Sequence, residues 1–204
     1  PACDLSAARF EGEAVLAALG NASSEIQVDV RFGPMRKREF IKIFKGHRIL
    51  HFAGHFDSKE DGPLGWRFAD GHVGPNEFRS LKGGSSPDLF FANACRAARA
   101  ADFSMLVDVG VQNYIAPVVD VPDLASADFS RRFYDALCRG DSVGNALRQA
   151  TWAGVVASDY VGLGYRLFGA PERKYFRTET RVESTIRVRR PCFVYLRLSG
   201  SDSY

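Results

Sequence analysis

Two side chains that could carry out chemistry, His55 and Cys95, each follow a short apolar run of the sequence. The first run reads RILHFAG over residues 48–54, and the second reads LFFANA over residues 89–94. If these runs form neighbouring parallel strands, the imidazole and the thiol meet at one carboxyl edge of the sheet, where ligands gather in α/β folds. A cysteine with a histidine is a candidate nucleophile with its acid/base partner. The sequence therefore predicts covalent thiol chemistry at this edge.

The segments around the two runs alternate between helical and strand patterns. We expect helices over 5–19, 35–45, 76–81, 95–109 and 124–139 and from 141 or 142 onward, and strands over 25–32, 47–53, 64–68, 88–92, 110–119 and 165–168. The helix over 95–109 would place the Cys95 thiol near a helix N-terminus. This order favours a three-layer α/β fold in which helices flank a mostly parallel central sheet.

The last part of the chain differs in character from the rest. Apolar and polar residues alternate over 181–189 and again over 192–198, which predicts a C-terminal β-hairpin extension that either packs on the sheet edge or opens a following domain. Residues 172–204 hold eight basic and four acidic side chains, so this segment carries the positive charge of the chain. We expect one domain over 1–171 and a basic extension over 172–204. Because the sequence starts without Met, we expect it to be a piece of a longer protein.

Composition excludes several classes of function. The net charge is only +3, and the basic residues form no concentrated stripe. We therefore expect no nucleic-acid partner for this domain. No apolar run is long enough to span a membrane, and the start lacks a signal pattern. Four widely spaced cysteines are too few for a disulfide framework, and reduced thiols indicate a cytoplasmic protein.

Two cofactor hypotheses are weak. His51 and His55 form H-x-x-x-H, which could bind zinc on a helix, but the surrounding residues are strand-like and no third ligand is compelling. The glycine-rich segments lack the spacing of a phosphate-binding loop. We therefore expect no metal and no organic cofactor. His51 and Gly54 are expected to support the site from behind His55.

The ordered set of motifs resembles one known family. ILHFAGH, then ANACRAA about 40 residues later, then GDSVGNALRQAT and YRLFGAP are similar to the conserved segments of the CHAT domain, a caspase-like branch of the clan CD cysteine peptidases. This resemblance covers residues 5–171. It implies a caspase-like fold, with Cys95 as the nucleophile and His55 as the general acid/base. It also implies an oxyanion hole made of the backbone amides of Phe56 and Cys95.

Two positions bear on activity and specificity. The family usually has glycine after the catalytic histidine, whereas this chain has Phe56, and phenylalanine tolerates a positive φ poorly. By the same resemblance, Asn93, two residues before Cys95, is expected to line the pocket for the substrate side chain at the cleavage site. Asp120 or Asp123 could instead supply a preference for a basic side chain.

The resemblance implies a cysteine endopeptidase that cleaves specific protein substrates through a thioester. CHAT domains usually belong to larger proteins with regulatory or effector-recruiting modules, often in bacterial defence or cell-death systems, so other domains or a regulatory partner are expected. The alternative is a catalytically silent caspase-like domain used for interaction or regulation. A flavodoxin-like ligand-binding domain ranks last, since RFGPMRK after the first strand does not resemble a phosphate-binding loop.

Overall fold

The computed structural model describes residues 6–20, 26–58, 64–81, 83–98, 100–176, 187–188 and 192–198. The helices are α1 (Ser6–Gly20), α2 (Lys37–Gly46), α3 (Pro75–Arg79), α4 (Ala100–Asp108), α5 (Asp123–Cys138), α6 (Val143–Val156) and the 3-10 helix η1 (Val161–Gly164). The strands are β1 (Ile26–Phe32), β2 (Ile49–Ala53), β3 (Phe56–Ser58), β4 (Leu64–Phe68), β5 (Gly71–Val73), β6 (Leu89–Asn93), β7 (Asn113–Pro117), β8 (Tyr165–Gly169), β9 (Arg187–Val188) and β10 (Cys192–Leu198). No helix in these ranges is long and apolar enough to cross a membrane.

A central sheet in the order β8-β7-β6-β2-β10-β1-β9 organises the described part of the chain. Strands β2, β6 and β7 pair in parallel, and β8 is antiparallel to β7. Every residue of β6 and β7 is buried, as expected for parallel strands covered on both faces. The predicted fold class, a mostly parallel sheet flanked by helices, is confirmed.

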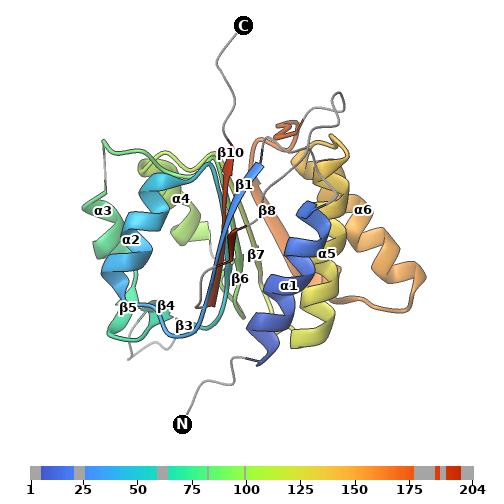
Figure 1. Cartoon of the computed structure of the whole chain (residues 1–204), viewed down its shortest axis with the longest axis horizontal. Helices are drawn as coiled ribbons and strands as arrows, with labels where there is room; N and C mark the ends of the chain where they lie inside the picture. The colour runs from blue at the N-terminus through green and yellow to red at the C-terminus, as the bar shows by residue number, and fades with distance from the viewer. Residues whose placement is uncertain are drawn as a thin grey trace, which may run out of the picture.

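Figure 1 shows the three layers, with the sheet seen nearly edge-on between two groups of helices. Helices α2, α3 and α4 cover one face, and α1, α5 and α6 cover the other. A small antiparallel sheet, β3-β4-β5, lies on the same side as α2. Because β3 begins directly after His55, this small sheet fixes the path of the chain on one side of the candidate site.

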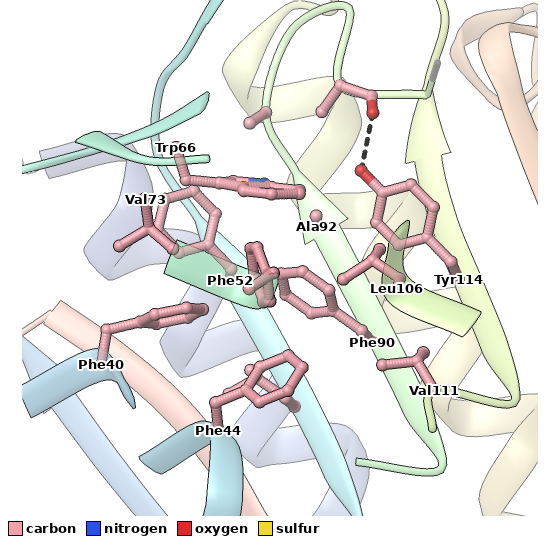
Figure 2. Close-up of a cluster of buried hydrophobic side chains, with 14 of the residues drawn as sticks. Phe40, Phe44, Phe52, Trp66, Val73, Phe90, Ala92, Leu106, Val111 and Tyr114 are labelled. Carbon is pink, nitrogen blue, oxygen red and sulfur yellow. Dashed lines mark hydrogen bonds between the residues drawn. The ribbon is translucent and has the colours of Figure 1, made fainter. Parts of the chain in front are cut away.

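Aromatic side chains fill the space between the sheet and α2. Phe40 and Phe44 of α2 pack against Phe90 of β6, and the Trp66 ring of β4 lies 5.4 Å from the Phe90 ring (Figure 2). These side chains are almost fully buried, and such rings supply large apolar areas and favourable tilted contacts. The small sheet is therefore anchored in the main core through Trp66.

The opposite face of the sheet packs on α1 and α5. Phe91 of β6 contacts Phe133 and Tyr134 of α5, because successive side chains of a strand point to opposite faces. The sequence predicts a helix over 5–19 without settling which face it buries, and Phe10 on α1 is 50% exposed. The buried stripe of α1 instead consists of Glu11, Gly12, Val15, Ala18 and Leu19. The spacing 11, 15, 18 and 19 is also helical, so periodicity alone allowed either stripe.

The C-terminal strands do not form the predicted hairpin. Strand β10 lies between β2 and β1 and is antiparallel to both, while β9 pairs in parallel with the other side of β1. Alternation along a strand predicts a half-buried strand but not its neighbours, which is why the sequence suggested a local pair. Residues 181–186 lie outside the described residues. The division into 1–171 and 172–204 stays a prediction, because strand register does not show where a module ends.

Candidate functional site

The two reactive side chains follow a pair of residues that are in register on neighbouring strands. Ala53 of β2 is in register with Asn93 of β6, and His55 and Cys95 each come two residues later. Both line one pocket of about 580 Å³ at the carboxyl edge. The other lining residues are Ala7, Ala8, Glu11, Gly33, Pro34, Met35, Phe52, Ala53, Gly54, Arg67, Phe68, Ala69, Asn93, Ala94, Val121, Asp123 and Ser126. The strand pairing therefore brings together the thiol and imidazole that the sequence places 40 residues apart.

Cys95 lies in a tight turn after β6, half-buried at the pocket wall. The backbone N–H of Val121 donates to Sγ at 3.5 Å, and the Val121 carbonyl oxygen lies 3.9 Å from Sγ. No described residue accepts a hydrogen bond from the Cys95 backbone N–H. This amide and the thiol are therefore both available to a bound molecule.

The turn that carries Cys95 is not the start of a helix, so the predicted helix over 95–109 is wrong at its beginning. Arg96 adopts a φ of 58°, and α4 begins only at Ala100. The Arg96 amide donates to the Val119 carbonyl after β7 at 3.2 Å, and the Ala98 amide donates to the carbonyl of Pro117, the last residue of β7, at 2.9 Å. The Tyr114 hydroxyl also donates to the Ala97 carbonyl at 2.6 Å (Figure 2). Bonds to β7 and its following loop therefore hold the turn.

His55 is exposed at the rim, and its backbone is held by two neighbouring strands. The Arg67 amide of β4 donates to the His55 carbonyl at 2.9 Å, and the Gly54 amide donates to the Asn93 carbonyl at 3.1 Å. A Cβ on Gly54 would meet the Phe52 ring at 2.8 Å, so a side chain is disfavoured there. The His55 ring has no hydrogen-bond partner within the described ranges. The imidazole is therefore free to serve a substrate.

Phe56 has ordinary strand geometry rather than a strained backbone. It belongs to β3, opposite Trp66 of β4, and it does not have a positive φ. Because Arg67 donates to the His55 carbonyl, Phe56 and Trp66 form a non-hydrogen-bonded pair of the antiparallel ladder. The Phe56 N–H therefore points away from β4 and is not used by that strand. The phenylalanine ring packs on Trp66 at 5.2 Å.

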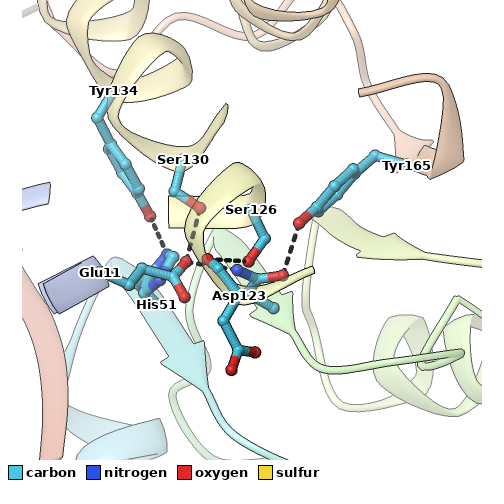
Figure 3. A network of polar contacts seen from close by, with 8 residues as sticks. Glu11, His51, Asp123, Ser126, Ser130, Tyr134 and Tyr165 are labelled. Atoms are coloured by element: carbon cyan, nitrogen blue, oxygen red, sulfur yellow. Dashed lines mark hydrogen bonds and ion pairs between the residues drawn. The ribbon is translucent and has the colours of Figure 1, made fainter. Parts of the chain in front are cut away.

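A buried polar network lies behind the pocket (Figure 3). Oε1 of Glu11 accepts hydrogen bonds from Asn93 Nδ2 at 2.6 Å, Ser130 Oγ at 2.7 Å and His51 Nε2 at 3.0 Å. His51 Nδ1 lies 3.3 Å from the Tyr134 hydroxyl. His51 is thus buried and hydrogen-bonded. Glu11 belongs to the same network, but it was not identified from the sequence as a site residue. The feature that could have indicated Glu11 is an acidic residue one helical turn before Val15, within the stripe of residues that α1 buries.

Comparison with protein families adds the deciding observation. A family model described as "CHAT domain" matches residues 3–155, which is three quarters of the chain. The chain belongs to the CHAT domain family. Its fold is accordingly that of a caspase-like domain related to clan CD. Among curated proteins, none matches this chain.

In this CHAT domain the predicted substrate-binding residues lie in different places. Asn93 borders the pocket but is almost fully buried, and its Oδ1 accepts from the Tyr165 hydroxyl at 2.6 Å. Asp123, at the first turn of α5, borders the pocket, and its side chain has no partner among the described residues. Asp120 instead pairs with Arg96 at the surface and does not border the pocket. Of the two acidic candidates, only Asp123 can face a ligand there.

An ion pair joins the three strands of the small sheet. Asp57 of β3 binds the Arg67 guanidinium of β4, with Oδ2 2.8 Å from Nε, and the His72 ring of β5 at 2.6 Å. The hydrogen bond from Arg67 is the main cause that lowers the pKa of Asp57 to about 2, with His72 adding to it against the effect of burial. Arg67 also holds the His55 carbonyl, so this ion pair supports the position of His55.

The other described thiol differs chemically from Cys95. Burial raises the pKa of Cys138 to about 12, and the nearby Asp135 adds to this effect. Cys138 therefore remains a protonated thiol at neutral pH. Within the described ranges no group of three or more metal-binding side chains occurs, and His51 and His55 do not share a helix face, because His51 belongs to β2.

Proposed function

We propose that this CHAT domain is a cysteine endopeptidase that uses Cys95 and His55 as a catalytic dyad. The observation that carries this proposal is the register of β2 and β6, which brings both side chains to one pocket. In this reaction the Cys95 sulfur attacks the carbonyl carbon of the scissile peptide bond. His55 takes the thiol proton and delivers it to the leaving amine as the C–N bond breaks, and the acyl group stays on sulfur as a thioester. His55 then accepts a proton from water as the water oxygen attacks the thioester, which releases the acid and restores the thiol.

Two backbone amides support the stabilisation of the oxyanion. The N–H of Cys95 has no acceptor among the described residues, and the N–H of Phe56 points away from its partner strand. Backbone donors of this kind typically stabilise a tetrahedral intermediate by about 3 kcal/mol each. Because Phe56 has an ordinary strand conformation, the absence of glycine at this position imposes no backbone strain. This supports activity over the silent-domain alternative.

The biological setting is also a proposal. We propose a cytoplasmic module of a longer bacterial signalling, defence or cell-death protein, which cuts a specific protein substrate when a regulatory partner or neighbouring domain activates it. The half-buried Cys95 and the pocket that it lines together with His55 support a selective rather than a digestive peptidase. The reaction as written needs only side chains and backbone amides of this chain.

Covalent labelling tests the proposal directly. Peptidyl acyloxymethyl ketones, which alkylate a catalytic thiol, should modify Cys95, and mass spectrometry would locate the label. Cys95→Ala should abolish labelling, and Cys138→Ala should leave it unchanged. His55→Ala should lower kcat/KM on a cleaved peptide by about 100-fold or more, whereas His47→Ala, at the opposite end of β2, should not. A chain that is never labelled, even with added activators, would be a silent caspase-like domain.

A further inference from the structure

Glu11 is a buried carboxylate with one oxygen left for a ligand. The residue is only 4% exposed, yet it borders the pocket that holds His55 and Cys95. Three donors converge on Oε1, while Oε2 has no partner among the described residues. Figure 3 shows this second oxygen turned away from Ser130. An almost completely buried acceptor with an open oxygen thus borders the reactive pocket.

The histidine that binds Glu11 is itself held by Tyr134 on the other side of its ring. Burial, and secondarily Glu11 itself, raises the pKa of Tyr134 well above its ordinary value, so this hydroxyl keeps its proton. Within the described ranges its hydrogen-bond partner is His51 Nδ1 alone, and a buried donor without an acceptor costs free energy. The hydroxyl therefore donates to Nδ1, which leaves the proton of His51 on Nε2, facing Glu11. His51 thus contacts only Oε1 of Glu11, and Oε2 receives no hydrogen bond from it.

Among the described pocket residues, Arg67 has the only guanidinium, and it is engaged elsewhere. The guanidinium of Arg67 is bound by Asp57 through two hydrogen bonds, and Asp123 of α5 adds a second carboxylate to the pocket lining. Because Glu11 is almost completely buried, an oxygen without a hydrogen-bond donor lacks the compensation that buried polar groups normally have. A cationic group of a ligand would supply that compensation at Oε2.

The position of Glu11 fits the substrate residue on the amino side of the cleaved bond, called P1. Glu11 is bound to Asn93, which precedes Cys95 by two residues. Two extended residues span no more than about 7 Å, so a long side chain attached at the reacting carbonyl can reach this depth. Short or apolar side chains would leave the carboxylate without a partner.

We propose that Glu11 selects substrates with arginine or lysine at P1, by binding the cationic head group through Oε2. This role rests on the proposed function, because a P1 residue exists only if Cys95 attacks a peptide bond. Nothing in the spacing of the sequence indicates this role, since Glu11 stands 84 positions before Cys95 on a separate helix.

Matched probes on the unaltered chain test the charge preference. Three acyloxymethyl ketones would differ only at P1, with arginine, its neutral isostere citrulline, or leucine. We expect the arginine probe to label Cys95 about 10- to 100-fold faster than the citrulline probe, as for loss of a charge-assisted hydrogen bond. Equal rates for these two probes overturn the role of Glu11 but leave the peptidase proposal standing. If no probe labels Cys95, the peptidase proposal itself fails.

Two variants then identify the acid. Glu11→Gln keeps an acceptor for the three donors but removes the charge, so the arginine preference should disappear while labelling by the leucine probe is retained. Asp123→Asn should change the preference by less than threefold. If the preference survives in Glu11→Gln, or is lost in Asp123→Asn alone, Glu11 is not the selecting residue. Should Glu11→Gln fail to fold, the arginine to citrulline ratio of the unaltered chain still decides the substrate class.

Discussion

Phe56 stands where CHAT domains usually carry glycine, and its side chain has a structural role here. The ring is 8% exposed and packs edge-on against Trp66, the residue directly opposite on β4. Cross-strand aromatic pairs of this kind stabilise antiparallel sheets. The replacement of glycine by phenylalanine therefore stabilises the small sheet, while the backbone amide stays available next to His55.

Removing this ring should destabilise the protein without removing the amide. We expect Phe56→Ala to lower the free energy of unfolding by about 3 kcal/mol, as for other buried phenylalanines. Urea unfolding followed by tryptophan fluorescence would measure it. Phe10→Ala is the matched control, because Phe10 is half exposed on α1 and should cost much less. Equal losses in the two variants would mean that the Phe56 ring is not part of the core.

The two described thiols should differ strongly in reactivity. Because the pKa of Cys138 is raised to about 12, its thiolate fraction at pH 8 is roughly one thousandth or less. Iodoacetamide should therefore modify Cys95 well before Cys138, as read by mass spectrometry of peptides over time. Modification of Cys138 as fast as Cys95 in the folded protein would contradict the burial of Cys138.

At the level of elements, the small sheet β3-β4-β5 fixes the position of the chain just after β2. Trp66 anchors this sheet in the aromatic core, and the Arg67 amide holds the His55 carbonyl. Asp57 links all three strands through Arg67 and His72. The position of His55 therefore depends on the small sheet, whose strands lie within residues 56–73.

The Asp57 ion pair of the small sheet should make the free energy of unfolding depend on pH below about pH 4. The pKa of Asp57 is depressed from 3.8 to about 2 in the folded protein, so its ionised form is favoured there. Its contribution is present above about pH 4 and is lost as the pH falls from about 4 toward 2. The stability difference between the unaltered chain and Asp57→Asn, measured by urea unfolding, should thus be constant from pH 7 to 5 and smaller at pH 3. A difference that does not change with pH would show that the carboxylate charge is irrelevant.

For the molecule as a whole, β10 connects two parts of the sheet. It pairs with β2 on one side and β1 on the other, so in the described part of the sheet β10 separates β1 from β2, the strand that leads to His55. Val194 is in register with both His51 and Val30. The C-terminal strand is therefore a structural neighbour of the site, although it lies about 100 residues beyond Cys95.

A proline at position 194 tests this arrangement. Proline has no N–H and is excluded from central strands, so Val194→Pro should lower the free energy of unfolding by at least about 2 kcal/mol. Val194→Thr keeps the backbone N–H and the β-branched shape, and it should cost less. Thermal unfolding followed by circular dichroism would compare the two. A chain that tolerates proline as well as threonine would not have β10 inside the sheet.

The sequence alone determined the fold class and the pairing of His55 with Cys95. Both follow from short-range patterns, because buried parallel strands appear as apolar runs and their carboxyl ends meet at one edge. The family resemblance added the roles of these two residues, which remain a proposal. The structure corrected two features of the surroundings: Cys95 lies in a turn rather than in a helix, and β10 lies inside the sheet rather than in a hairpin.

Only the tertiary structure decided what lies behind the pocket. Glu11, His51, Asn93 and Ser130 come from four separate elements, and no periodic pattern shows that their polar atoms converge. Such convergence depends on how α1 and α5 pack across the sheet, which is a property of side-chain shape over long sequence distances. Sequence patterns predict single helices and strands, whereas the polar groups that face a ligand are brought together by the packing of several elements.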